Sequence, residues 1–412
     1  MKKIAIIGGG LSGLSVANIL KEKYNVTIFE KDARQGGLIK CERVNGNLYH
    51  ICGGHVFNSK RQDVLDWFWS FFNQDEEFIK ADRNAVVFME DGNKIPYPIE
   101  NHAYHFDDKM LKSFIDDLII LAKTESQEYD NFEDFLKNRF GTTLYKEYFE
   151  PYNKKIWKTE LSEIPLTWLE GKLPMPTLSE IVYNNIKQTK EKSFVHSTFW
   201  YEKNNGSQYI VDTLSKDLDI KCNAEIKKIF RREDKWQVEN IIFDKVIFCG
   251  ILKDLPNMIE GIDISEFAES IQNLKSHGTT TVFCEIDSNE YSWIYLPSKS
   301  YDAHRIICTG NFAKTNNAKD HILTGTIEFT DYISKEEILV ELDKMPLKPK
   351  YLKHTFNKFS YPVQDSDTRD MISNLKNKLG KEDFFLTGRF ADWEYYNMDV
   401  AIGAAIDLCK KI

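Results

Sequence analysis

The sequence predicts an α/β protein in which a nucleotide-binding domain is combined with a helical insert and an antiparallel-sheet substrate domain. Three observations predict this class. A glycine-rich turn separates an apolar run from a helical pattern near the N-terminus. Apolar residues recur at helical spacing between positions 107 and 150, which indicates amphipathic helices. Strand-like runs then follow one another from position 279 to position 356, as in an antiparallel sheet.

The N-terminal segment contains a strand, a tight turn, a helix, a second strand and an acidic residue, in that order. In such a unit the glycines let a pyrophosphate approach the backbone, and the N–H groups at the helix start face its charge. The acid accepts a hydrogen bond from a ribose hydroxyl. The pattern therefore predicts a dinucleotide-binding site. Its expected contacts are Gly8, Gly10, Leu11, Ser12, Gly13 and Glu30.

Composition and charge limit the other functions. The chain has 412 residues, of which 42% are apolar, enough for two or three domains with substantial cores. Its net charge of −9 without a Lys/Arg block argues against nucleic-acid binding. Seven widely spaced cysteines without a C-x-x-C pair favour reduced thiols in a cytoplasmic protein, so we expect no disulfide framework and no metal site. No apolar run reaches the length of about 18 residues that predicts a membrane-spanning helix.

Two further glycine pairs predict contacts with the same nucleotide cofactor. The pair at positions 36 and 37 follows the acid closely and allows another close approach of the backbone. The pair at positions 53 and 54 precedes a histidine, so backbone and imidazole could both approach a planar ligand. His50 is expected to be structural. The contacts expected from these segments are Lys31, Gly37, Leu38, Gly54 and His55.

A helical insert is expected between residues 103 and 190. Asn131 is suited to cap one of its helices, and the helical pattern continues to Pro151, where we expect it to end. The segment around Trp157 is expected to be an irregular, mobile loop, and such loops can act as lids. The lysines expected to be solvated are Lys154, Lys155 and Lys158.

The second half of the chain adds the sheet and returns to the nucleotide-binding domain. Arg305 and Glu328 lie on expected strands, as functional charges or as a surface ion pair. Near the C-terminus a buried strand ends at Gly388 and a helix begins at residues 397–399, so a second helix start can face a polar cofactor edge. The expected domains are residues 1–80, 197–255 and 360–412 for the cofactor, 103–190 for the insert, and 81–102 with 256–359 for the substrate.

Five sequence blocks resemble a flavoprotein family, the UDP-galactopyranose mutases, whose wider class includes amine oxidases and protoporphyrinogen oxidase. The blocks are Gly53–Phe57, Tyr152–Trp157, His304–Ile307, Tyr361–Val363 and Gly388–Asp399. The resemblance implies a Rossmann-like FAD-binding domain. It also implies an enzyme that interconverts pyranose and furanose forms of a nucleotide-linked sugar, with N5 of the reduced flavin as nucleophile. An FAD-dependent amine oxidase or dehydrogenase, a non-catalytic flavin-bound scaffold and a homodimer stay open.

The resemblance also implies roles for single residues. The implied catalytic residues are His55, beside the flavin, Arg305, as the cation for the substrate diphosphate, and Tyr361 and Tyr395, which would hold that diphosphate. The implied substrate contacts further include Tyr152, Asn153, Trp157 and Glu328, and the implied FAD contacts include Ile226, Gly388, Arg389, Asn397, Met398 and Asp399. Where the family has two diphosphate-binding arginines, this chain has Thr159 and either Gln272 or Asn273. Neither kind of side chain replaces a bidentate arginine.

Overall fold

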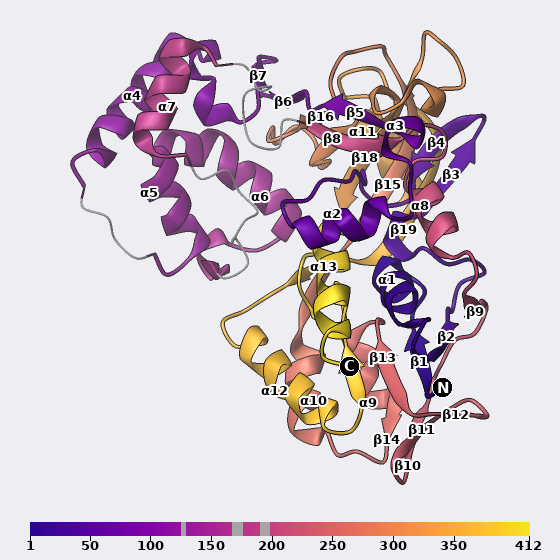
Figure 1. Cartoon of the computed structure of the whole chain (residues 1–412). Coiled ribbons are helices and arrows are strands. Elements are labelled where there is room, and N and C mark those ends of the chain that lie inside the picture. Colours follow the sequence, from indigo (N-terminus) through magenta and orange to yellow (C-terminus); the bar gives the residue numbers. More distant parts are fainter. Residues whose placement is uncertain (125–128, 167–175, 190–197) are drawn as a thin grey trace.

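A computed structural model describes residues 1–124, 129–166, 176–189 and 198–412 (Figure 1). Its centre is a five-stranded parallel sheet in the order β20-β13-β1-β2-β9. The strands are β1 (Lys3–Ile7), β2 (Asn25–Phe29), β9 (Asp219–Lys221), β13 (Lys245–Phe248) and β20 (Phe384–Leu386). Parallel strands covered on both faces consist of continuous apolar runs, which is why the sequence identifies β1 and β2. The predicted strand–turn–helix–strand unit is confirmed.

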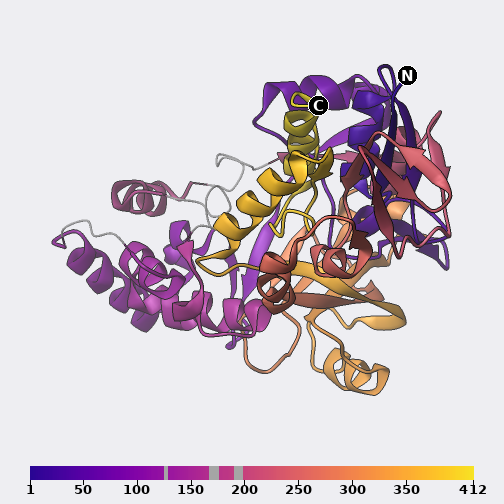
Figure 2. The same ribbon diagram turned by 90° about the horizontal axis from the view of Figure 1, so that it is seen from below.

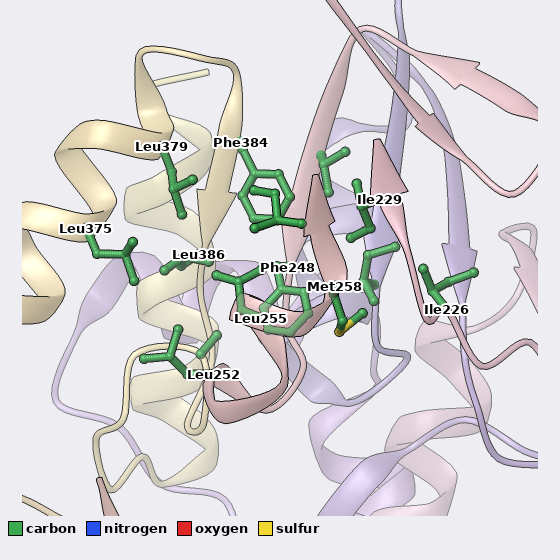
Figure 3. Packing of buried hydrophobic residues seen from close by; sticks show 14 of the residues in the cluster. Ile226, Ile229, Phe248, Leu252, Leu255, Met258, Leu375, Leu379, Phe384 and Leu386 are labelled. Atoms are coloured by element: carbon green, nitrogen blue, oxygen red, sulfur yellow. The ribbon is translucent and has the colours of Figure 1, made fainter. Parts of the chain in front are cut away.

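Alternate residues of β1 enter two separate cores. Ile4 and Ile6 pack with four helices, and Ala5 and Ile7 pack with three others and a small sheet of order β12-β11-β10-β14. In Figure 3, Phe384 lies among apolar side chains of this second core. The first four helices are α1 (Leu11–Leu20), α2 (Gln62–Trp69), α8 (Ser207–Leu214) and α13 (Met398–Cys409). The second core contains α9 (Leu255–Met258), α10 (Ser265–Asn273), α12 (Thr368–Gly380), β10 (Ile229–Arg232), β11 (Lys235–Val238), β12 (Ile241–Phe243) and β14 (Ile259–Glu260).

A seven-stranded sheet of order β19-β15-β18-β17-β16-β6-β7 lies beside the parallel sheet. Its strands pair antiparallel except for β16 with β6, so the predicted antiparallel sheet is confirmed. The strands are β6 (Ala85–Phe88), β7 (Lys94–Pro96), β15 (Lys275–Ile286), β16 (Trp293–Tyr295), β17 (Arg305–Ile307), β18 (Leu323–Thr330) and β19 (Lys350–Val363). Two-stranded ladders pair β3 (Cys41–Val44) with β4 (Asn47–His50), and β5 (Phe78–Asp82) with β8 (Thr198–Glu202). The domain boundaries drawn from the sequence stay a prediction.

The helical region stands to one side of both sheets, as the purple and magenta helices in Figure 2 show. Its helices are α4 (Asp108–Leu121), α5 (Phe132–Leu144), α6 (Glu150–Trp157) and α7 (Leu178–Lys187). Asn131 caps α5 as predicted, because its side chain accepts a hydrogen bond from the Asp134 N–H at 2.9 Å. Parts of the predicted insert, at 125–128, 167–175 and 190, lie outside the described residues. No helix in the described part of the chain has both the length and the apolar character that crossing a membrane requires.

The predicted irregular loop near Trp157 is wrong, because residues 150–157 form α6. Pro151 does not end a helix but lies in the first turn of α6, which directly continues the π-helical turn Tyr145–Phe149. The helix ends instead at Lys158, whose φ of 47° is left-handed. Trp157 therefore lies on a regular element that packs against the rest of the molecule.

Candidate active site

Few side chains cover the backbone of the glycine motif from Gly8 to Gly13, and we call this backbone the glycine surface. Gly8 has a φ of 108°, and a Cβ on Gly13 would lie 2.1 Å from the Gly8 carbonyl oxygen, so side chains are excluded at both positions. A Cβ on Gly10 would meet nothing nearer than the Gly37 Cα, at 3.9 Å. Leu11 and Ser12 begin α1, and the first N–H groups of a helix have no partner within it. The arrangement suits an anionic group at the start of α1.

Glu30 holds this turn together. Its carboxylate accepts hydrogen bonds from the Gly9 N–H at 2.8 Å and the Asp32 N–H at 2.9 Å, and the residue is 6% exposed. The neighbouring Lys31 is exposed. The predicted acid is therefore at the end of β2, next to the glycine surface.

The two ends of the chain meet at Ser12. A Cβ on Gly388 would lie 3.1 Å from the Ser12 Oγ, and α13 packs against α1. The buried Asp392 shapes the C-terminal segment, because it accepts hydrogen bonds from the Gly388 N–H at 3.1 Å and the Tyr396 hydroxyl at 2.9 Å. Asn397 is the residue before α13, and Met398 and Asp399 form its first turn. Two helix starts thus lie near the glycine surface.

His55 is half-buried, in a position that fits a bound cofactor. Its Nε2 is buried and has no hydrogen-bond partner in the described part of the chain, which is uncommon unless a ligand or water completes the site. Burial and the nearby Arg389 charge lower the pKa of His55 to about 4, so the imidazole is neutral near pH 7. His50 is structural as predicted, with its Nε2 2.9 Å from the Tyr201 hydroxyl. Ile226 is buried in the second core, and Leu38 packs against that core.

A buried carboxylate joins the histidine segment to Arg305. Glu328 on β18 is fully buried, and it accepts hydrogen bonds from the Gly53 N–H at 2.8 Å and from the Arg305 Nε. Burial alone would raise the pKa of Glu328, but Arg305 and His304 together outweigh it and lower that pKa to about 2. Arg305 also donates from Nη2 to the Tyr361 hydroxyl at 3.0 Å. The pair is internal and links both parts of the site, so it is not a surface ion pair.

Aromatic rings extend this cluster from Arg305 toward both α6 and Arg389. Tyr361 and Tyr395 stack with ring centroids 5.5 Å apart and planes 6° apart. The Arg389 guanidinium lies 4.5 Å from the centre of the Tyr395 ring. Trp157 meets Tyr361 edge-on at 6.1 Å, and Tyr152 meets Tyr295 of β16 at 5.4 Å. Residues that are far apart in the sequence therefore form one cluster around Arg305 and Tyr361.

The remaining predicted residues have other partners. The Asn153 amide donates to the Phe149 carbonyl of the preceding turn, Thr159 donates to Glu163, and Gln272 donates to the Lys253 carbonyl. The bonds that these three side chains donate are thus made outside the cluster. Sequence reasoning missed Ser360, whose carbonyl accepts from Arg389 at 3.2 Å, and Asp392. Ser360 directly precedes the block Tyr361–Val363, and Asp392 lies within the block Gly388–Asp399. This closeness is the signal that could have identified them.

Comparisons with known proteins agree with this architecture. Residues 6–74 match the family of NAD(P)-binding Rossmann-like domains. Over 99% of this chain and 94% of its own length, the UDP-galactopyranose mutase of Mycoplasma genitalium is 21% identical. The dTDP-fucopyranose mutase of Escherichia coli is 29% identical over 42% of this chain and 46% of its own length. A crystal structure of reduced UDP-galactopyranose mutase superposes with a TM-score of 0.88, at 20% identity, covering 100% of this chain and 93% of that one. Along its full length the chain is UDP-galactopyranose mutase-like in fold.

Proposed function

We propose that the protein is a flavin-dependent mutase that interconverts the pyranose and furanose forms of a nucleotide-linked sugar. The full-length likeness to a UDP-galactopyranose mutase and the partial likeness to a dTDP-fucopyranose mutase support this class. The observation that carries the proposal is the bridge through Glu328. One buried carboxylate binds both Gly53, in the segment proposed to face the cofactor, and Arg305, in the cluster proposed to bind the substrate.

FAD is the proposed cofactor, and the residues present fit it. The glycine surface at Gly10 and Gly37 and the start of α1 would hold the diphosphate, Glu30 the ribose, and His55 the flavin side of the site. The first turn of α13 would face the flavin edge. In its reduced form the flavin supplies an electron-rich nitrogen, N5, as the nucleophile for the anomeric carbon.

The protein's own residues would bind and orient the substrate diphosphate. An arginine carries five N–H donors. The hydrogen bonds described for Arg305 use the N–H of Nε and one N–H of Nη2, so donors remain for phosphate oxygens. Because the Tyr361 hydroxyl accepts from Arg305, its own proton can be donated to a phosphate. Burial raises the pKa of Tyr361, so that proton is retained at neutral pH. Trp157, edge-on to Tyr361, and Tyr395, stacked on it, would flank this position.

The test is turnover of nucleotide sugars by reduced protein. Dithionite-reduced protein is incubated with UDP-, dTDP- and GDP-linked pyranoses, and the products are examined by NMR for furanose rings. We expect furanose product with at least one of them, and none with oxidised protein. Absence of furanose product from all three nucleotide classes would refute the proposal.

A second candidate is an FAD-dependent oxidase or dehydrogenase. It is favoured by Thr159 and by either Gln272 or Asn273, which stand where the family has diphosphate-binding arginines. The Thr159 and Gln272 side chains donate hydrogen bonds to other groups. It predicts that an amine or a saturated substrate bleaches the flavin under nitrogen and that oxygen uptake follows on admission of air. A mutase would show neither change.

A further inference from the structure

The side chain of Lys155 is enclosed, although the sequence predicts a solvated lysine. Its Nζ donates hydrogen bonds to the backbone carbonyls of Leu296 at 2.7 Å and Ala303 at 3.1 Å, and to that of Ser298. An ammonium group has three N–H donors and no acceptor. Three carbonyls therefore match its full donor set.

The three carbonyls belong to the connection that carries part of the candidate site. Leu296 directly follows Tyr295 of β16, and Ala303 lies two residues before Arg305 of β17. This hairpin connection is itself closed by the Leu296 N–H, which donates to the His304 carbonyl at 2.9 Å. Holding these carbonyls therefore fixes the place where Arg305 enters the site.

The lysine lies on the helix that supplies the aromatic side of the same site. Lys155 is two residues from Trp157 and three residues, nearly one turn, from Tyr152 on α6. These two side chains meet Tyr361 and Tyr295 through ring contacts. Charge-assisted hydrogen bonds are shorter and stronger than hydrogen bonds between neutral groups. The lysine is therefore suited to fix where α6 lies along the sheet.

We propose that Lys155 is a positioning residue, which fixes the separation between Trp157 on α6 and Arg305 on β17 and so shapes the substrate diphosphate site. The inference rests on the proposed function for the identity of the substrate. The three hydrogen bonds from Lys155 to the β16–β17 connection, which we call the clamp, are a separate claim about the structure. The two can therefore fail independently.

The charge of Lys155 gives the clamp a pH dependence. The charged groups that act on it are Asp302, Glu341 and Glu90, which favour its protonated form, and Lys158, which opposes it. Burial dominates and lowers the pKa of Lys155 to about 8. A neutral amine keeps two N–H donors for three carbonyls, so the clamp is expected to weaken as the pH rises above about 8.

The first test compares Lys155→Met with Lys154→Met. Lys154 is the adjacent residue on α6, but it pairs with Glu150 and Glu160 near the surface. Hydrogen–deuterium exchange is measured for α6 and for residues 296–303 at pH 7. Losing charge-assisted hydrogen bonds worth about 1.5–3 kcal/mol corresponds to roughly 10- to 150-fold faster exchange. We expect this acceleration in Lys155→Met and not in Lys154→Met; equal exchange in the two variants would overturn the clamp.

The second test separates substrate binding from folding. In Lys155→Met we expect KM for the nucleotide sugar to rise about tenfold or more, with kcat changed less and FAD content unchanged, because the bonds lost stabilise the binding geometry. In the wild type KM should rise between pH 7 and pH 9, and this rise should be absent from Lys155→Met. A lower kcat with unchanged KM would refute the positioning role.

Failure of Lys155→Met to fold and absence of wild-type turnover have different consequences. If Lys155→Met does not fold, exchange of wild-type α6 at pH 7 and pH 9, corrected for intrinsic rates, decides the clamp. Unchanged protection at pH 9 would then overturn it. If the wild type turns over no nucleotide sugar, the proposed function fails, while the exchange comparison still supports or refutes the clamp.

Discussion

The glycine surface and the arginine–tyrosine cluster belong to one candidate site but are built differently. The first is backbone, made mainly by the first turn between Gly8 and Gly13 and by Gly37. The second is made of side chains from α6, β17, β18, β19 and the segment before α13. The first depends on the absence of side chains, and the second on the mutual neutralisation of buried charges. The two should therefore respond to substitution in different ways.

The largest expected effect is on the backbone half. In Gly10→Val we expect complete loss of FAD uptake, because the added side chain occupies the surface that a pyrophosphate approaches. The fold should be retained, since the nearest atom to an added Cβ is 3.9 Å away. The flavin absorbance of purified protein and the circular dichroism spectrum measure the two effects.

Gly380→Ala is the matched control for this substitution. Gly380 ends α12, and the nearest atom to its added Cβ is a Phe385 ring carbon, also at 3.9 Å. It should keep its full flavin content. A yellow Gly10→Val protein would show that the cofactor does not approach this turn.

The side-chain half should lose stability as well as activity. Arg305→Met leaves Glu328 charged and buried without its partner, and breaking such a pair costs about 3–5 kcal/mol. Urea unfolding measures this loss. Turnover should fall in parallel, because the cation proposed for the diphosphate is removed.

A double variant separates these two consequences. Arg305→Met combined with Glu328→Gln removes both charges, so much of the stability should return while activity stays low. If the single and double variants are equally unstable, the cluster is not governed by charge balance.

An acid titration provides a smaller test of the same half. The pKa of Glu328 is lowered from 4.5 to about 2 in the folded protein. A lowered carboxyl pKa contributes stability above the unfolded value and loses it as the pH falls through the folded one. Between pH 4.5 and about 2, the wild type should therefore lose more stability than the double variant. Parallel unfolding curves over this interval would argue against the ion pair.

Tyr361→Phe should have the smallest effect. It removes the hydroxyl that accepts from Arg305 at 3.0 Å but keeps the ring stacked on Tyr395. The expected loss is about 1.5–3 kcal/mol of stability, because the bond is donated by a charged group, together with a higher KM for the nucleotide sugar. Thermal unfolding and steady-state kinetics test this. Tyr351→Phe is a control, because its hydroxyl lies 2.8 Å from His354 Nδ1, outside the cluster.

The same contrast explains what the sequence could predict. The turn at Gly8–Gly13 and the acid Glu30 follow from spacing within one short segment, and the buried runs of β1 and β13 identify the parallel sheet. Only the family resemblance predicts that Arg305, Tyr361 and Tyr395 belong to one site, because no local pattern joins two separate strands and a loop.

The burial of Lys155 and the helix α6 are not predicted by local sequence patterns. Two adjacent lysines shortly after a proline are typical of exposed irregular structure, but the acceptors of Lys155 lie more than 140 residues further along the chain. The sequence predicts a helix end at Pro151, although a proline is equally compatible with the first turn of a helix. Only the tertiary arrangement decides between these alternatives.

The contact between Ser12 and Gly388 has a consequence for biosynthesis. The β1 strand emerges early from the ribosome, but its neighbour β13 and the outer strand β20 are translated far later. A nascent chain therefore lacks the outer strand of this sheet until Phe384–Leu386 has been synthesised. Uptake of the proposed cofactor is therefore expected only after the segment around Gly388 has been made, and fragments that end before it should stay colourless.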